Sequence, residues 1–541
     1  MVTSPQRAYR AACPNCGAPV DFASAASASA VCSFCRSTLV REGDALRRIG
    51  ISAELFDDHS ALQLGVRGTR QGVAFTLVGR LQYAYEGGTW NEWHALFDNG
   101  RSAWLSEDNG AYVISFDAPL PKDAAADAAA LESLRAGQRV LADGRAWDVA
   151  SVTRAKLLAA QGELPQPPQL QGEFWVADLR NSAGEVATLD GNQAAAGASG
   201  AGATWAVGRT VALSELALTG LKDDSTKTLS GRAFECPNCG NALEVKLATT
   251  QSITCGQCST VVDVSAGVGA DMAHYQQANA GVAGAEPQIP LGSTGKLALG
   301  VGAVGALLPW QVVGYVERCD IPESSEDETS FWREYLLFNQ LEGFAFLVDS
   351  NDGWSWVRPI TGVPAVRGEK AEWQGRTYAK KWAYGAKITW VQGEFYWRVK
   401  RDERAHVIDY EGIGAHSKAR LSREQAGNEV TWSAGETLAA ATVADAFGIA
   451  AGSRAAMQRD VAPVNFGASG ATKALLIFFL VVVLMIMLTQ CNSSNDCADV
   501  RSTFGEASTE YQQCQRNRSS GGTRTGGGSY GGWSSGSGGH K

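Results

Sequence analysis

The sequence predicts a mainly β protein made of two copies of one unit, and three observations support this. Eight of the twelve cysteines fall into two clusters with the same spacing. Aromatic and apolar segments follow each cluster in the same order, and Asn-Gly or Asp-Gly pairs between them indicate β-hairpins. We therefore expect two zinc ribbons and two small antiparallel β-domains, each a barrel or a sandwich, then one transmembrane helix and a disordered tail.

Composition narrows the functional classes. The chain has 541 residues, a net charge of -9, 45% hydrophobic residues and 19% charged residues, which suits packed domains rather than broad disorder. Nucleic-acid binding is disfavoured, because such proteins usually present a basic face. The cysteine clusters have few neighbouring cations: Arg36, Arg41 and Lys246.

The cysteine clusters have the spacing of metal sites. Each reads C-x2-C-x15-C-x2-C, within the range of a four-thiolate zinc site. Disulfide pairs and redox Cys-x-x-Cys motifs are the alternatives, but no thioredoxin-like βαβ pattern surrounds the clusters. Four protein ligands close a site, so we expect two structural zinc ions in a reducing compartment. The proposed ligands are Cys13, Cys16, Cys32 and Cys35 in the first cluster, and Cys236, Cys239, Cys255 and Cys258 in the second.

The other four cysteines are expected to have different roles. Cys319 lies within the second repeat and is interpreted as a buried or loop thiol rather than a nucleophile. Cys491, Cys497 and Cys514 all lie near the end of the chain, where the last two could form a disulfide outside the membrane.

An internal duplication sets the domain organisation. Gly79-Arg-Leu-Gln-Tyr83 and Trp90-Asn-Glu-Trp93 have counterparts in Gly314-Tyr-Val and Phe331-Trp-Arg-Glu-Tyr335. Later motifs recur in the same order, such as Gln161-Gly-Glu and Gln392-Gly-Glu. The predicted parts are zinc ribbon 1 at 8–48, β-domain copy 1 at 50–222, zinc ribbon 2 at 231–265, a linker at 266–290, β-domain copy 2 at 291–450, the transmembrane helix at 473–491 and a Gly/Ser-rich tail at 492–541.

Turn signals place the strands of the first domain. Residues 93–97, 103–105 and 111–116 are expected to form a meander with turns at 98–100 and 107–110. In copy 2, Lys387–Val391 and Phe395–Val399 are expected to pair as a hairpin about Gln-Gly-Glu. Helix should be minor, and is predicted near 124–135, 213–218 and 439–447.

These motifs together resemble the bacterial domain-of-unknown-function family 4178. The resemblance covers most of 50–220 and 290–450, and copy 1 matches it better. Copy 2 differs, with a longer loop at 320–329 and Asn339-Gln-Leu-Glu in place of Asp-Asn. The resemblance implies zinc ribbons, membrane segments and a part in a membrane-associated system, but no established activity.

One segment has the character of a membrane span. Ala474–Leu488 is an uninterrupted apolar run, for which a buried core helix is the alternative. Arg454, Arg459 and Lys473 precede it and only Arg501 follows nearby, so the positive-inside rule places residues 1–473 in the cytoplasm. We expect a single pass through the inner membrane with the tail outside, and no signal peptide in residues 1–10.

No catalytic motif stands out, so the candidate interaction residues come from the repeated hairpin. Glu92 and Glu334 occupy the same place in both copies, and either carboxylate could form an ion pair, with Arg101 or Arg333, or belong to a ligand site. His94 is interpreted as a strand surface residue whose counterpart is absent or apolar. The candidate ligand or interaction residues are Trp90, Glu92, Trp93, Arg101, Trp104, Glu334 and Tyr335.

The expected function follows from these features. The sequence favours a non-enzymatic interaction or scaffold module, anchored at the membrane and bound to a protein partner. The alternative is a β-domain that senses or transforms a small molecule or lipid headgroup.

Overall fold

The computed structural model describes residues 9–458, all within the first of two compact units of the chain. Within the described part, no helix has the length and apolar character that crossing a membrane requires. The predicted span at 473–491 and the tail at 492–541 lie outside the described residues. The gaps are 23–28, 43–44, 52–59, 86–87, 109–110, 123–127, 169–171, 192–202, 223–231, 246–249, 265–273, 277–286, 300–305, 323–328, 340–341 and 400–401.

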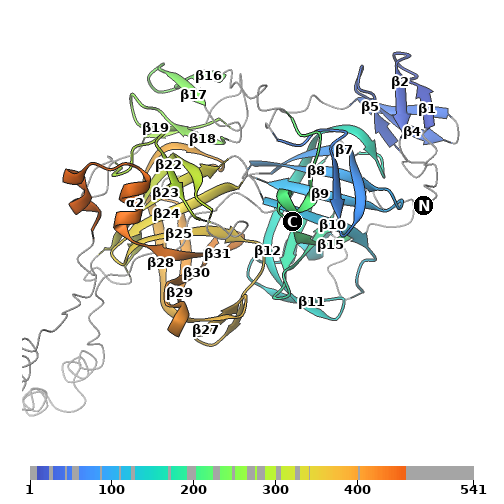
Figure 1. Cartoon of the computed structure of the whole chain (residues 1–541). Helices are drawn as coiled ribbons and strands as arrows, with labels where there is room; N and C mark the ends of the chain where they lie inside the picture. The colour runs from blue at the N-terminus through green and yellow to red at the C-terminus, as the bar shows by residue number, and fades with distance from the viewer. Residues whose placement is uncertain are drawn as a thin grey trace, which may run out of the picture. The chain divides into compact units, whose positions relative to one another are not determined.

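Copy 1 is a closed antiparallel barrel of eight strands (Figure 1). Each strand pairs with the next, and the last pairs with the first, so no edge of this sheet is left open. An eight-stranded barrel is wide enough for its side chains to fill the interior or for one small ligand. In ring order the strands are β7 (Val73–Tyr85), β8 (Gly88–Phe97), β9 (Ser102–Asp108), β10 (Ala111–Ala118), β15 (Thr204–Thr210), β14 (Glu185–Asp190), β13 (Phe174–Arg180) and β12 (Arg145–Leu164).

Copy 2 closes in the same order, so the duplication predicted from sequence extends to the barrel itself. Its ring is β22 (Leu308–Ile321), β23 (Phe331–Asn339), β24 (Gly343–Ser350), β25 (Gly353–Ile360), β31 (Glu429–Leu438), β30 (Ala419–Ala426), β29 (Arg404–Gly412) and β28 (Arg376–Phe395).

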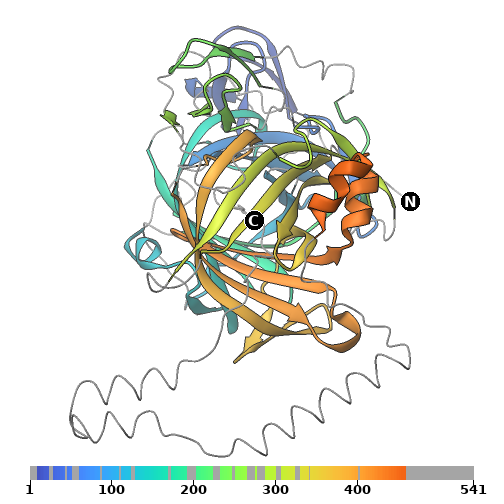
Figure 2. The same cartoon turned by 90° about the vertical axis from the view of Figure 1, so that its left-hand side faces the viewer.

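Short elements surround each ring. Helix α2 (Ala440–Ala446) lies beside the strands of copy 2 (Figure 2). Its Val443 and Ala444 belong to the same core cluster as Leu297 and Trp310. The others are β6 (Arg67–Arg70), α1 (Ala128–Ser133), β11 (Arg139–Ala142) and η2 (Leu213–Leu216) in copy 1, and β21 (Thr294–Leu297), β26 (Ala365–Arg367), β27 (Lys370–Trp373), η4 (Gly414–His416) and η5 (Ala451–Met457) in copy 2.

The predicted meander is present, with β8, β9 and β10 paired in sequence, and the expected turn at 98–100 joins β8 to β9. The hairpin predicted about Gln392-Gly-Glu is wrong, because these residues lie inside the continuous strand β28. Gly393 has φ +87°, and a Cβ there would lie 2.3 Å from the Val313 carbonyl oxygen. Glycine therefore marks a close crossing of β28 and β22 rather than a turn. Gly162 on β12 makes the same approach to Val78 in copy 1.

Each cysteine cluster lies in a small β-ribbon. Ribbon 1 comprises β1 (Tyr9–Ala12), β2 (Pro19–Phe22), β3 (Ser29–Val31), β4 (Ser37–Glu42) and β5 (Ala45–Ile51). Ribbon 2 comprises β16 (Arg232–Glu235), β17 (Ala242–Val245), β18 (Ser252–Thr254), β19 (Thr260–Asp263) and β20 (His274–Gln276). Strand β20 falls within the stretch expected to be a linker, and it pairs with β19.

Each ribbon adds a strand to the end of the longest strand of its barrel. Strand β3 pairs with β12 and β18 pairs with β28. Ser29 Oγ donates to the carbonyl oxygens of Leu164 and Gln166, at 3.3 and 2.8 Å. Ser252 Oγ donates to the Trp397 carbonyl at 2.9 Å, so both copies use a serine at the same junction.

Candidate metal centres and a candidate ligand cavity

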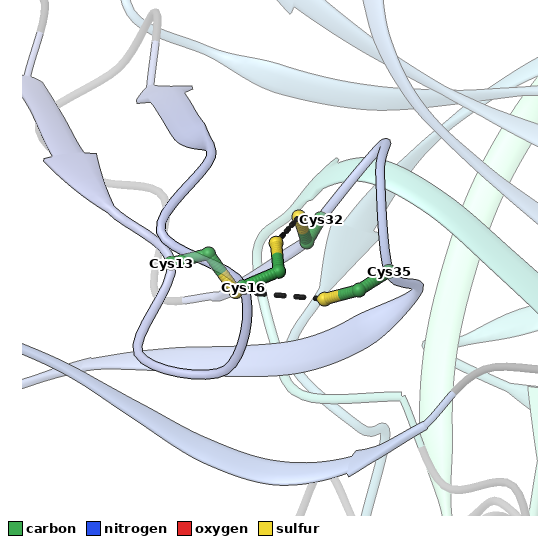
Figure 3. Close-up of side chains that lie close together, drawn as sticks. All are labelled: Cys13, Cys16, Cys32 and Cys35. Atoms are coloured by element: carbon green, nitrogen blue, oxygen red, sulfur yellow. Dashed lines mark hydrogen bonds between the residues drawn. The ribbon is translucent and has the colours of Figure 1, made fainter.

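The eight predicted metal ligands lie in two tight clusters. In ribbon 1, the Sγ atoms of Cys13 and Cys35 are 3.6 Å apart and those of Cys16 and Cys32 are 3.7 Å apart (Figure 3). The corresponding distances in ribbon 2 are also 3.6 and 3.7 Å. In each cluster all four sulfur atoms lie within 4.8 Å of one another.

These distances fit a tetrahedral metal and exclude disulfides. Four sulfurs at about 2.3 Å from a zinc ion lie about 3.8 Å from one another. A disulfide needs about 2.05 Å between sulfurs, and all eight cysteines are free thiols. Each cluster could therefore hold a metal such as zinc.

The local backbone explains why these sequences form metal-binding turns. In the turn that begins at Cys13, the Gly17 N–H donates to the Cys13 carbonyl at 2.8 Å, and Gly17 has φ +76°. Arg36, Gly240 and Ser259 repeat both the hydrogen bond and the positive φ in the other three turns. The left-handed residue after each second cysteine closes the turn, and only two of the four turns use glycine there.

The cysteines within a cluster perturb the pKa values of one another. The pKa of Cys35 is lowered to about 5, first by the Ser37 hydroxyl, 3.2 Å from its sulfur. The pKa of Cys16 is raised to about 12: the Ala18 backbone opposes this rise, but the neighbouring cysteines, beginning with Cys35, cause it. Four thiolates this close repel one another, and a divalent cation removes that penalty.

A cavity of about 330 Å³ lies in copy 1. Its aromatic wall includes Tyr83 and Trp90, whose rings stack at 4.9 Å, and Phe174, which meets Tyr83 edge-on at 5.9 Å. Asp117 is exposed, so the cavity opens to solvent at that edge. The lining residues are Leu81, Tyr83, Trp90, Glu92, Trp104, Asp117, Ala118, Leu120, Leu157, Pro165, Gln166, Pro167, Pro168, Phe174, Val176, Thr188, Asp190, Ala203, Thr204, Trp205 and Ala206.

The cavity is acidic. Its lining contains the carboxylates of Glu92, Asp117 and Asp190, and among the described lining residues there is no Lys, Arg or His. Burial raises the pKa of Tyr83, and the negative charges of Glu92 and Asp190 raise it further. Both carboxylates therefore act on the same point of the aromatic wall.

Copy 2 has an arginine where copy 1 has Tyr83. Strand register makes the positions equivalent, because Tyr83 pairs with Trp90 and Arg318 pairs with Trp332. The Arg318 guanidinium is buried, and its Nη1 lies 3.2 Å from Glu334 Oε1 and its Nη2 lies 3.1 Å from Glu424 Oε1. Its Cζ also lies 5.6 Å from the Trp332 ring centroid.

The two carboxylates that hold Arg318 also have counterparts in copy 1. Glu334 and Glu92 occupy the same register on β23 and β8. Glu424 pairs with Val407 as Asp190 pairs with Val176, on equivalent strands. Burial raises the pKa of Glu424 to about 7, although Arg318 acts in the opposite direction. Copy 2 thus neutralises this acidic pair with its own side chain.

The structure separates the predicted interaction residues into two groups. Trp90, Glu92 and Trp104 line the cavity of copy 1. Trp93 faces the opposite side of β8, since side chains alternate along a strand, and its Nε1 donates to Glu107 at 3.0 Å. Tyr335 is likewise buried in a core of copy 2.

The predicted ion-pair partners also differ. The Arg101 guanidinium stacks on Phe116, with Cζ 4.4 Å from the ring centroid. Glu334 pairs with Arg318, whereas Arg333 pairs with Asp349 at 3.3 Å. Sequence reasoning missed Arg318 and Glu424, and the available signal for the first was an arginine two residues after Val316, on the strand face that Val316 shares.

The interpretation of His94 as a strand surface residue is wrong, because its side chain is buried. Its Nδ1 donates to the Glu163 carbonyl, and its Nε2 lies 2.9 Å from Ser102 Oγ. Burial lowers the pKa of His94, although its bond with Glu163 opposes this effect. Its counterpart by register is apolar Leu336, as the sequence indicated.

Cys319 is also buried, and burial raises the pKa of its thiol.

Comparison with known proteins gives one match. The model of the family described as "Domain of unknown function (DUF4178)" matches residues 63–213 and 306–440, which together exceed half of the chain. These two regions contain the strands of the two barrels. No curated protein and no solved structure matches the chain.

Proposed function

Because the chain belongs to the DUF4178 family and carries its domain twice, we propose from its own geometry that it is a zinc-stabilised, non-enzymatic binding protein. Copy 1 receives a small ligand in its barrel, and copy 2 is a closed structural partner. The observation that supports this division is the difference at one register position. Copy 1 has a cavity beside Tyr83, whereas copy 2 has the buried side chain of Arg318.

The metal has a structural role in this proposal. Four cysteines leave no coordination position for a substrate, so zinc would hold each ribbon rather than act on a ligand. Each ribbon in turn is joined to the end of β12 or β28. Metal binding would thereby fix one end of each barrel's longest strand.

Two further parts of the proposal rest on sequence alone. Residues 473–491 would span the inner membrane once, with residues 1–473 in the cytoplasm and the tail outside. A protein partner at the membrane would then receive the signal that ligand binding in copy 1 produces. Nucleic acid is an improbable partner for an acidic chain with a net charge of -9.

The test is a substitution that fills the cavity with a larger side chain. Ala118→Trp introduces a large ring into its lining, and we expect it to remove the small molecule that the full-length chain carries after purification from its native cells. Mass spectrometry of the denatured supernatant measures the ligand. The matched control is Ile360→Trp, at the corresponding position of copy 2, because Ile360 pairs with Trp432 as Ala118 pairs with Trp205.

Equal ligand content in both variants, in a folded Ala118→Trp chain, would contradict binding in copy 1. Absence of any copurified ligand would be followed by titration with the cationic and neutral probes described below. If none of these probes binds the wild-type chain, the proposed binding function is wrong.

A further inference from the structure

We propose that the cavity of copy 1 binds the guanidinium or ammonium group of a low-molecular-weight organic cation, held by Glu92 and Asp190 against the aromatic wall. This inference rests on the binding function proposed above and specifies its ligand. It comes from copy 2, where the chain itself shows which group these positions hold.

In copy 2, a guanidinium group of the chain itself occupies the equivalent position. The guanidinium of Arg318 makes hydrogen bonds with Glu334 and Glu424 at 3.1 to 3.2 Å. It also lies over the ring of Trp332, whose Nε1 donates to Glu334 Oε1 at 2.8 Å. Two carboxylates and one indole thus surround a single buried cation, which is a favourable combination of charge-assisted hydrogen bonds and cation–π attraction.

Copy 1 has residues of the same kind at the surrounding positions and a tyrosine in place of the arginine. Glu92, Asp190 and Trp90 occupy the positions of Glu334, Glu424 and Trp332 in the matching register. Tyr83 stands at the position of Arg318 and supplies no positive charge. The remaining space is the cavity, which Asp117 lines at its open edge.

Charge decides among the ligand classes. An anion would meet the carboxylates of Glu92, Asp117 and Asp190, whose field raises the free energy of any negative group. A divalent metal such as Ca²⁺ needs six to eight oxygen ligands, and much of this wall is aromatic or aliphatic. An organic cation is attracted both by the carboxylates and by the faces of the aromatic rings.

The volume indicates a ligand with a body as well as a charged head. A cavity of about 330 Å³ equals the space of roughly ten liquid water molecules. A guanidinium ion alone would leave most of this volume unfilled. The apolar side chains of Leu81, Leu157 and Phe174 line the remainder, so an aliphatic or aromatic body is expected.

Calorimetric titration of the full-length chain tests the proposal. The probe is N-propylguanidinium, which reproduces the Arg318 side chain beyond its Cα, and its matched neutral analogue is N-propylurea. We expect saturable binding of the cation with Kd of about 1 mM or tighter, and binding of the urea at least about 10-fold weaker.

Substitutions then locate the binding. Glu92→Gln and Asp190→Asn keep side-chain shape and remove charge, and each should weaken binding of the cation by about 10-fold or more. Asp148→Asn is the control, because Asp148 pairs with Arg139 outside the cavity. It should leave the affinity unchanged. Having two cavity variants guards against one that fails to fold.

A third substitution introduces the arginine of copy 2 into copy 1. Tyr83→Arg recreates the arrangement of copy 2, so the new guanidinium should occupy the site and reduce binding of N-propylguanidinium by about 10-fold or more. The same variant should unfold at a higher temperature than a chain carrying both Tyr83→Arg and Glu92→Gln.

The outcomes separate this inference from the function on which it rests. Equal affinity for the cation and the urea, or cation binding that neither Glu92→Gln nor Asp190→Asn weakens, overturns the cationic ligand. If the ligand copurified with the wild-type chain is neutral and is lost in Ala118→Trp, the binding function stands and the inference is wrong. Absence of saturable cation binding overturns the inference.

Discussion

The two barrels differ in the residue that lies beside an equivalent pair of carboxylates. Copy 2 has Arg318 paired with both Glu334 and Glu424, whereas copy 1 has Tyr83, whose pKa the charges of Glu92 and Asp190 raise. Ring order, strand register and ribbon attachment are common to both copies. The comparison shows that a duplicated barrel can keep its frame while the residue at one interior position changes from an arginine to a tyrosine.

Removal of metal should have the largest effect, and it tests whether the copies depend equally on their ribbons. We expect two zinc ions per chain, and one after either Cys13→Ser or Cys236→Ser. Structural zinc supplies about 10–16 kcal/mol of apparent binding energy, which becomes folding energy of its ribbon. Elemental analysis gives the stoichiometry, and hydrogen exchange follows β3 or β18. Two zinc ions in either variant would contradict the assigned ligands.

Arg318→Met should reduce the stability of copy 2 and leave the stability of copy 1 unchanged. It leaves Glu334 and Glu424 buried without their cation, which should reduce stability by about 3–5 kcal/mol. Tyr83→Phe at the equivalent position removes no charge and should cost about 1 kcal/mol or less. Urea denaturation followed by hydrogen exchange of peptides from each barrel distinguishes the two. A loss below about 1 kcal/mol for Arg318→Met would show that the pair is not a buried ionic cluster.

Acid should distinguish the copies through His94, which only copy 1 has at this position. Burial lowers its pKa from the ordinary 6.5, so the unfolded chain binds the proton more readily than the folded barrel. Copy 1 should therefore lose stability as pH falls below 6.5, by up to about 1.4 kcal/mol per pH unit until the folded pKa is reached.

The matched variant is His94→Leu, which introduces the residue of copy 2. Denaturant unfolding of copy 1 between pH 7 and pH 5 should then lose the part of its slope that His94 causes. An unchanged slope would assign the acid sensitivity to other groups.

Arg101→Ala should have the smallest effect. Its guanidinium stacks on Phe116, and loss of this contact should cost about 0.5–1 kcal/mol. The variant should bind N-propylguanidinium as the wild-type chain does. A change in that affinity would bring Arg101 back into the ligand site, as the sequence alone allowed.

Sequence reasoning succeeded where local chemistry demands a fixed spacing. A metal needs two sulfurs on each tight turn, so Cys13 and Cys16 could be assigned from their separation. The turn signals at 98–100 and 107–110 predicted the meander, because hairpin partners are adjacent in sequence. The repeat carried both predictions to copy 2, where Glu92 and Glu334 proved equivalent.

Sequence reasoning failed where the contacts join residues that are far apart in the chain. Glu424 is 106 residues from Arg318, and only closure of the barrel brings their side chains together. Gln392-Gly-Glu looked like a hairpin because glycine commonly marks turns, but here the missing Cβ allows β22 to pass close by. Trp93 and Trp90 were grouped by proximity in sequence, although strand alternation sends them to opposite sides.

The serine at the ribbon junction connects ribbon 1, which carries a cysteine cluster, with the lining of the cavity. Ser29 holds the carbonyl of Gln166, and Gln166 itself lines the cavity with Pro165, Pro167 and Pro168. The rim of the ligand cavity is thus fastened to ribbon 1. A free-energy coupling between two sites is reciprocal, so an occupied cavity should also tighten the hold on zinc. Ribbon 1 and the cavity would then form one thermodynamic unit, in which occupancy of either site changes the affinity of the other.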